Sequence, residues 1–249
     1  MSDHDILPGL VRRLGRHGPL DPDDVAAVLE LPYTLRTAEP GSHLIREGDE
    51  PTHCCFVVDG FVYRHKVTGE GQRQILAIHM NGDLVDLHNI FLDVSDHNVQ
   101  ALTRSNIAFV PRRSVRDLIF SRPNVGRAMW TETLIDASIF REWVLNVGRR
   151  PAIARIAHIL CEVATRMEQA GLSDGGDYTL PMTQEQLADA AGLTSVHVNR
   201  VLQQLGRMGL IERSKRAVHV PDWARLRETA DFNARYLHRD EGLRSHARG

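Results

Sequence analysis

Residues 183–220 decide the fold, and they read TQEQLADAAGLTSVHVNRVLQQLGRMGLIERSKRAVHV. Thr183 and Gln186 have the spacing of a capping box, in which each side chain bonds the other residue's backbone N–H at a helix start. Gly192 favours a sharp turn, because glycine adopts positive φ without a steric penalty. Thr194 can then cap a second helix. The stretch therefore predicts two short helices joined by a tight turn.

The second predicted helix has two unlike faces. Apolar residues at helical spacing predict a buried stripe of Val198, Val201, Leu202 and Leu205. The opposite face lies near the N-terminal end, where a recognition helix offers side chains to base edges in the major groove of double-stranded DNA. The candidate DNA-contacting residues of the two helices are Thr183, Thr194, Ser195, Val196, His197, Asn199 and Arg200.

A basic β-hairpin is predicted directly after the two helices. The residues LI at 210–211, RSKR at 213–216 and AVHV at 217–220 predict a strand, a basic turn and a second strand. Such a wing beside the helix can touch phosphate. Its candidate phosphate contacts are Arg213, Lys215 and Arg216. Two crossed helices also suit an ordinary hairpin in a core, and the wing favours DNA binding over that alternative.

The overall charge is nearly balanced. The 249 residues carry a formal net charge of −2, so DNA affinity must come from a local basic patch. Cys54, Cys55 and Cys161 form neither a disulfide framework nor a Cys-x-x-Cys metal motif, and no metal site is expected. No apolar run reaches membrane-spanning length and the N-terminus lacks a signal-peptide pattern, which predicts a cytoplasmic protein without a membrane partner.

The expected fold class is α+β with three parts. Residues 1–122 predict short N-terminal helices and a small β-sandwich or barrel, because β-rich runs alternate with Gly- and Asp-bearing turns. Residues 123–148 predict one long helix, and the sequence GRRP at 148–151 predicts a hinge. A loop is expected at 171–177. Residues 149–249 are expected to hold the winged helix-turn-helix, a further helix and a polar tail.

The long predicted helix carries an apolar stripe. Its members are Met129, Phe140, Trp143 and Val147. On a monomer this stripe would expose an unusually large apolar patch. We therefore expect it to form the interface of a homodimer.

The order of these parts resembles the Crp/Fnr family of bacterial transcription regulators. The resemblance covers nearly the whole chain and rests on NGDLVDL at 81–87, REWVLNVGRR at 141–150 and LADAAGLTSVHVNRVLQQLGRMGLI at 187–211. The last two segments look most like the rhizobial-type branch. The resemblance implies a sensor-like β-roll, a jelly roll of the cyclic-nucleotide-binding kind, followed by a dimerisation helix and a winged helix-turn-helix. It also implies a homodimer that binds a palindromic operator, works with RNA polymerase and is no enzyme.

Departures from the family pattern bear on the ligand and on DNA readout. Asp86-Leu87 replaces the Gly-Glu pair of cyclic-nucleotide-binding members, residues 84–100 contain no arginine, and Phe140-Arg141 replaces the Thr-Ser that reads adenine. A cyclic phosphate needs a cation or a cluster of donors, so cyclic AMP is not expected to bind. Val196 replaces the family's glutamate and suits a thymine methyl, whereas Arg200 suits guanine O6 and N7.

The effector and any cofactor remain open. Haem ligated by His79 or His88, and a redox switch at Cys54-Cys55, are alternatives within the same fold. The N-terminal cysteine cluster of the oxygen sensors is missing, so an iron–sulfur cluster is not expected. A metal-dependent β-roll enzyme would need a His-x-His motif, and Asp86-x-His88 is the only near match. A roll without any ligand, serving only as a scaffold, is equally compatible with the sequence.

Overall fold

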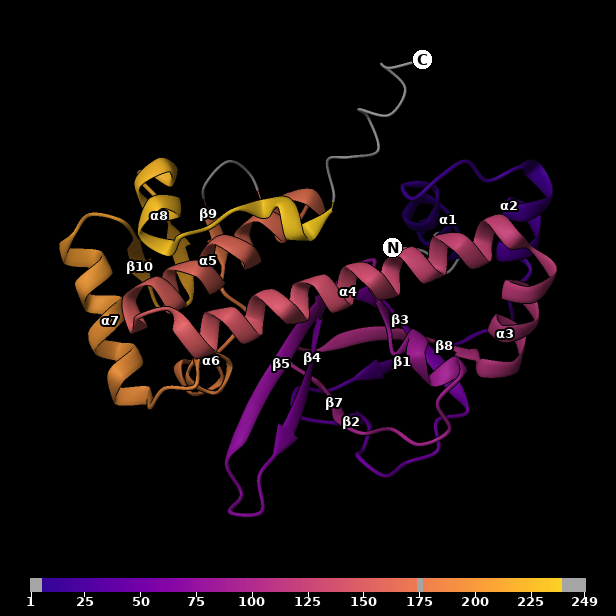
Figure 1. Cartoon of the computed structure of the whole chain (residues 1–249), viewed down its shortest axis with the longest axis horizontal. Coiled ribbons are helices and arrows are strands. Elements are labelled where there is room, and N and C mark those ends of the chain that lie inside the picture. Colours follow the sequence, from indigo (N-terminus) through magenta and orange to yellow (C-terminus); the bar gives the residue numbers. More distant parts are fainter. Residues whose placement is uncertain (1–5, 174–176, 239–249) are drawn as a thin grey trace. The chain divides into compact units, whose positions relative to one another are not determined.

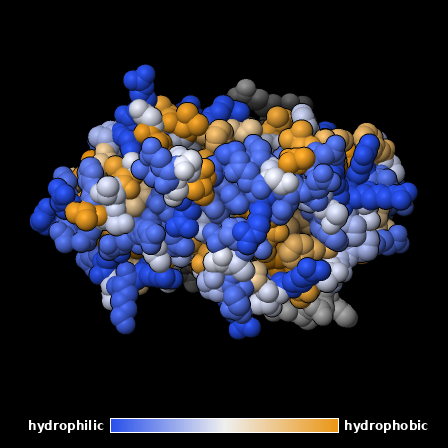
Figure 2. Space-filling model, turned by 90° about the horizontal axis from the view of Figure 1, so that it is seen from below, coloured by the Kyte–Doolittle hydropathy of each residue, from blue (hydrophilic) through white to orange (hydrophobic). Residues whose placement is uncertain are grey.

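The computed structural model describes residues 6–173 and 177–238 (Figure 1). These residues belong to two units. The first contains 6–64, 78–138 and 237–238, and the second contains 65–77 and 139–236. None of the helices in the described ranges is long and apolar enough to cross a membrane. The face shown in Figure 2 carries small groups of apolar side chains scattered among hydrophilic ones, which is ordinary for a folded protein surface.

Two helices precede the sheets, as predicted: α1 (Ile6–Gly15) and α2 (Pro22–Leu29). The buried face of α1 consists of Ile6, Leu7, Leu10 and Leu14. Asp21 caps α2 by accepting a hydrogen bond of 2.8 Å from the backbone N–H of Asp24, and Pro22 follows at the first helical position, where its missing N–H costs nothing.

Eight strands form the predicted β-roll in two sheets, ordered β1-β8-β3-β6 and β2-β7-β4-β5. The strands are β1 (Thr34–Ala38), β2 (His43–Ile45), β3 (His53–Asp59), β4 (Phe61–Val67), β5 (Arg73–Met80), β6 (Leu84–Val85), β7 (Asn98–Ala101) and β8 (Ser105–Pro111). A 3-10 helix, η2 (Leu87–Ile90), follows β6, and α3 (Arg112–Ser121) follows β8. Strand β1 had given no signal in the sequence, because its residues are mostly exposed.

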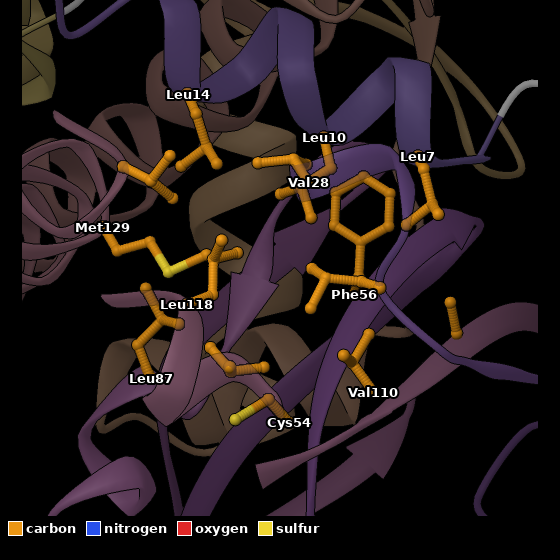
Figure 3. Packing of buried hydrophobic residues seen from close by; sticks show 14 of the residues in the cluster. Leu7, Leu10, Leu14, Val28, Cys54, Phe56, Leu87, Val110, Leu118 and Met129 are labelled. Carbon is orange, nitrogen blue, oxygen red and sulfur yellow. The ribbon is translucent and has the colours of Figure 1, made fainter. Parts of the chain in front are cut away.

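Strand β3 is buried on both faces. Cys54 and Phe56 pack into a cluster with α1, α2, α3 and the start of α4 (Figure 3). Cys55 and Val57 point the other way, into the cluster between the two sheets. This explains the unbroken apolar run in the sequence of β3, since a strand covered on both faces has no polar alternation.

The turn from β3 to β4 requires glycine. Gly60 has φ +90°, and a Cβ there would lie 2.7 Å from the carbonyl oxygen of Arg104. Any larger residue would force the turn and β8 apart, because L side chains rarely adopt this φ and backbone cannot move aside cheaply.

The long helix α4 (Pro123–Arg149) extends one residue beyond the predicted boundary. It continues through Gly148, so the predicted hinge at 148–151 is wrong in its first half and only Arg150 and Pro151 lie outside helices. Arg150 is buried and its Nη2 donates to a side-chain oxygen of Glu142 at 2.7 Å. An exposed glycine in the last turn of a helix costs only about 1 kcal/mol, which the contacts of its neighbours can offset.

The second unit is a winged helix-turn-helix. Its elements are α5 (Ala152–Gln169), β9 (Asp177–Thr179), α6 (Gln184–Ala191), α7 (Ser195–Arg207), β10 (Glu212–Ser214), β11 (Ala217–His219), α8 (Trp223–Ala230) and the 3-10 helix η3 (Ala234–Leu237). The wing sheet is ordered β10-β11-β9. Asp177 was predicted to lie in a loop but begins β9, while residues 174–176 and the predicted polar tail at 239–249 lie outside the described residues.

Candidate DNA-binding interface and sensor cluster

The first helix of the motif begins as the sequence predicts. The backbone N–H of Gln186 donates to Thr183 Oγ1 at 3.2 Å, and the backbone N–H of Thr183 donates to Gln186 Oε1 at 2.8 Å. Thr183 is half-buried and its hydroxyl serves this cap. Gly192 ends the helix at φ +63°, the left-handed conformation that lets α7 begin three residues later.

Helix α7 presents the predicted faces. Thr194 caps it through a 3.2 Å hydrogen bond from the backbone N–H of His197. The four apolar residues of the predicted stripe are all buried. The opposite face is exposed and consists of Ser195, Val196, His197, Asn199 and Arg200. We call these five residues the reading face.

The wing turn exposes two cations. Lys215 and Arg216 lie between β10 and β11, and both side chains are exposed. Lys215 adopts φ +54°, which lets a two-residue turn close the hairpin. Strand β11 pairs antiparallel with β9, so the turn extends from a three-stranded sheet.

Arg213 does not lie in this turn. It belongs to β10, opposite Val218, and is half-buried. Its Nη2 donates to the carbonyl oxygen of Lys215 at 3.3 Å, and burial lowers the pKa of its guanidinium. The predicted strand at 210–211 is likewise wrong: Leu210 and Ile211 precede β10 and are buried. The second strand begins at Ala217 as predicted, but the first was predicted two residues too early, because an apolar pair at a helix end resembles a strand start.

The predicted dimer stripe on α4 is divided between the interior and the surface. Met129 packs in the core of the first unit (Figure 3). Trp143 is buried and its Nε1–H donates to Glu162 Oε1 at 3.1 Å. Val147 is half-buried, and only Phe140 is exposed. The stripe as predicted is therefore not an exposed patch, because two of its four members are covered by their own chain.

A different row of apolar residues is exposed along α4. It consists of Trp130, Leu134, Phe140, Val144 and Leu145. Trp130, Leu134 and Val144 fall near the 3.5-residue spacing of a coiled-coil seam. We call these five residues the α4 row.

A buried cluster of charged side chains lies around Asp86 in the roll. The sequence indicates Asp86 but not its charged partners. Arg64 of β4 bonds two carboxylates, Asp86 and Asp136 of α4. The distance from Arg64 Nε to Asp86 Oδ1 is 3.1 Å. Burial opposes the charges, but Asp136 and Asp86 raise the pKa of Arg64, and Arg64 and His97 lower the pKa of Asp86. Arg64 lies 22 residues before Asp86 in the chain, and no local sequence pattern indicates this pairing.

Two histidines surround the same aspartate. His97 Nε2 lies 3.0 Å and His88 Nε2 lies 3.9 Å from Asp86 Oδ1. Burial and the positive charge of Arg64 lower the pKa of His88, whereas hydrogen bonds to Asp86 and Asp96 raise the pKa of His97 against the effect of burial. His79, on β5, was an equal candidate with His88 in the sequence. It lies beside Asp83, with 4.0 Å from its Nδ1 to Oδ2, and is not part of this cluster.

The three cysteines are buried thiols. Burial raises the pKa of Cys54 to about 12 and that of Cys55 well above its usual range. Because the thiolate is the form that oxidises readily, this environment disfavours a redox switch at the pair. Cys161 lies in the core of α5, as its apolar neighbours in the sequence predicted.

Two parts of the chain match known families. Residues 35–122 match the cyclic nucleotide-binding domain, and residues 154–229 match the Crp-like helix-turn-helix domain. The chain is 31% identical to a probable transcriptional activator of Rhizobium leguminosarum bv. viciae, over 77% of this chain and 79% of that protein. It is 29% identical to the transcriptional activator protein FnrL of Cereibacter sphaeroides, over 92% of this chain and 96% of that protein.

A solved structure shows the same architecture. FixK2 from Bradyrhizobium japonicum superposes with a TM-score of 0.75 at 26% identity, over 82% of this chain and 100% of that chain. A β-roll of cyclic-nucleotide-binding type followed by a winged helix-turn-helix defines a DNA-binding transcription regulator. The chain belongs to the Crp/Fnr family of these regulators. The relatives are regulators, so the enzyme alternative is excluded.

Proposed function

We propose that the protein is a homodimeric regulator that binds a palindromic operator in double-stranded DNA. The observation that carries the proposal is the reading face of α7, whose five side chains are exposed, as are the two cations of the wing turn. In this arrangement α7 lies in the major groove, with Arg200 toward a guanine and Val196 toward a thymine methyl. Lys215 and Arg216 contact phosphate.

The two proposed base-reading side chains, Arg200 and Val196, are accessible to DNA. The Arg200 side chain is exposed on α7, so its guanidinium is accessible for a bidentate pair with guanine O6 and N7. Val196 is 64% exposed. Most of this apolar side chain meets solvent in the free chain, and contact with a thymine methyl would cover part of it.

The α4 row supports dimerisation. Trp130, Val144 and Leu134 are at least half exposed, and a helix with such a row gains stability by pairing with a second copy. Two copies related by a two-fold axis place two α7 helices on two half-sites, which matches a palindromic operator. Bound near a promoter, the dimer would meet RNA polymerase, the partner implied by relatives named transcriptional activators.

Dimerisation is tested by light scattering. We expect the wild type to be a dimer at micromolar concentration and Val144→Asp to shift it toward monomer. Val67→Asp is the matched control, because Val67 is also exposed, at 44%, but lies on β4. A monomeric wild type, or equal behaviour of the two variants, would contradict the role of the α4 row.

The roll is proposed to sense something other than a cyclic nucleotide. The guanidinium of Arg64 beside Asp86 is already bonded by two carboxylates, so a cyclic phosphate entering there would meet those carboxylates and would have to displace one of them from Arg64. Calorimetric titration with cyclic AMP and cyclic GMP is expected to show no binding. Micromolar binding of either would show that the phosphate is held elsewhere in the roll.

The DNA-binding proposal as a whole is tested by selecting duplexes from a random pool with the purified protein. We expect the selected sequences to share a two-fold repeat with a guanine in each half-site. The two half-site centres should be about 10 base pairs apart or a multiple of that spacing. Selection of no sequence, or of a single unrepeated half-site, would overturn the proposal of a dimer on a palindrome.

A further inference from the structure

Three side chains with metal-binding atoms meet in the roll: Asp86, His88 and His97. Their nearest ligand atoms all lie within 4.8 Å of one another. Asp86 follows β6, His88 lies in η2 and His97 directly precedes β7. Two imidazoles and one carboxylate form a donor set suited to first-row transition-metal ions.

We propose that this cluster binds one divalent transition-metal ion of the Zn²⁺ class, through the carboxylate of Asp86 and the Nε2 atoms of His88 and His97. All three ligands belong to the roll unit. The site therefore does not depend on the proposed DNA binding, although an ion there would give the sensor an effector.

Buried atoms in the cluster lack hydrogen-bond partners. Asp86 is fully buried, and among the described residues no group bonds its Oδ2 or the buried Nε2 of His88. A buried acceptor without a partner costs about 1–3 kcal/mol. A metal ion held by His88 Nε2 and by both oxygens of the Asp86 carboxylate would give both atoms a partner at once, which hydrogen bonds within the cluster do not.

The surroundings of His97 fit a metal ligand. Its Nδ1 lies 2.7 Å from Asp96 Oδ1, on the side of the ring away from Asp86. An ion that displaces the Nε2 proton now shared with Asp86 meets the Nε2 lone pair, while the proton on Nδ1 stays bonded to Asp96. Histidines that bind metals commonly have such a carboxylate behind them, because it fixes the ring orientation and makes the ligating nitrogen more basic.

Only a small movement is needed to close the site. Ligands about 2.0–2.2 Å from Zn²⁺ are roughly 3–3.5 Å apart, and the two distances to Asp86 Oδ1 are 3.0 and 3.9 Å. His88 is the ligand that must approach, and its side chain is 26% exposed and not bonded at Nε2, so it can turn.

Arg64 connects the proposed site to α4. Its guanidinium bonds both Asp86 and Asp136. An ion on Asp86 repels this neighbouring cation, so metal binding weakens the bond to Asp86 and leaves Arg64 to Asp136. Metal occupancy thereby changes a contact of the helix that carries the α4 row.

The test is calorimetric titration of chelator-treated full-length protein with ZnCl₂. We expect one ion per chain, and His88→Ala to weaken the site by more than the roughly 10–100-fold typical of an outer-shell change. His53→Ala is the matched control, because His53 also lies in the roll, on β3, outside the cluster. Asp96→Asn should weaken binding about 10-fold through His97, and the substitution alters no buried side chain, because Asp96 is exposed.

Co²⁺ provides a second readout, because its visible absorption depends on its ligands. We expect the Co²⁺ spectrum of the wild type to persist in His53→Ala and to be lost in His88→Ala. MgCl₂ should not displace the ion, since Mg²⁺ prefers oxygen ligands. Absence of saturable binding, wild-type affinity in His88→Ala, or equal weakening in His53→Ala would overturn the site, and the last would assign the ion to surface histidines.

Discussion

The reading face of α7 and the charge cluster of the roll place their polar groups in opposite ways. The five side chains of the reading face are exposed on one helix. The cluster of Arg64, Asp86 and His97 is buried and connects three separate segments of the roll. Residues of the first kind are available to a partner and contribute little to folding. Residues of the second kind are part of the fold, so replacing them changes stability before it changes function.

The largest effect is expected in the first unit, from Glu132→Ala on α4. Arg13 Nη2 donates to Glu132 Oε2 at 2.7 Å, and Arg13 Nη1 lies 2.8 Å from Asp83 Oδ1, with all three side chains largely buried. Removing one member of a buried ion network leaves an uncompensated charge and costs about 3–5 kcal/mol. Urea denaturation measures this loss in the free energy of unfolding.

A surface pair provides the control for that experiment. Arg113 and Asp117 lie 3.8 Å apart on α3, and both are exposed. Asp117→Ala is expected to cost less than about 1 kcal/mol, because solvent screens such pairs. If the two substitutions cost the same, burial does not distinguish the Arg13–Glu132–Asp83 network from a surface ion pair.

On the reading face we expect Arg200→Ala to reduce DNA affinity and to leave the free energy of unfolding nearly unchanged, the reverse of Glu132→Ala. It should weaken binding to the cognate operator by about 1–3 kcal/mol and leave non-specific affinity intact. The free energy of unfolding should change by no more than about 0.5 kcal/mol. Binding curves on cognate and scrambled duplexes measure the first effect. Equal weakening on both duplexes would mean that Arg200 contacts phosphate and reads no base.

The same contrast explains what the sequence could predict. The reader motif depends on contacts three or four residues apart, such as Thr183 with Gln186, so its caps, turn and faces are visible in one stretch. The roll cluster depends on the contacts of Arg64 with Asp86 and with Asp136. These two residues lie 22 and 72 residues beyond Arg64 along the chain. No local pattern reports such a pairing. The α4 stripe failed for a related reason: periodicity showed that Met129 and Trp143 are apolar, but not which face their own chain covers.

The second unit, which carries the exposed reading face, also contains a buried titratable group, the histidine His158. His158 of α5 is 1% exposed, and its ring stacks on Tyr236 with 5.8 Å between centroids. Its Nε2 lies 3.2 Å from Glu142 Oε1, an oxygen that Arg150 already bonds. Burial, with a smaller contribution from Arg150, lowers the pKa of His158 to about 3.

This pKa predicts a dependence of stability on pH. The folded state keeps His158 neutral, whereas the unfolded chain binds a proton near the ordinary pKa of 6.5. The contribution is complete above that value and is lost as pH falls toward 3, so about 2 kcal/mol disappears between pH 7 and pH 5. His158→Gln should lose correspondingly less over this interval in urea denaturation. The same decrease in both proteins would show that other groups cause it.

The smallest effect concerns the wing, where one sequence prediction named three equivalent cations. Lys215 and Arg216 are exposed, but Arg213 is half-buried and bonds the turn backbone. We expect Lys215→Ala and Arg216→Ala each to weaken all duplexes alike and to reduce the salt slope of binding by about 1, as expected for one lost phosphate contact. Neither should change the free energy of unfolding measurably.

Arg213→Ala tests whether a wing arginine affects DNA binding through its charge alone or only when its side chain is exposed. It removes the same charge as Arg216→Ala, yet its guanidinium donates to the Lys215 carbonyl oxygen and its stem lies against the wing sheet. We therefore expect it to lower the free energy of unfolding by about 1 kcal/mol, the value of one hydrogen bond. The salt slope of the remaining folded protein should change less than in Arg216→Ala. The contrary outcome is that Arg213→Ala reduces the salt slope by a full unit and leaves the free energy of unfolding unchanged. That result would identify Arg213 as a phosphate contact and show that a half-buried wing arginine can still reach DNA.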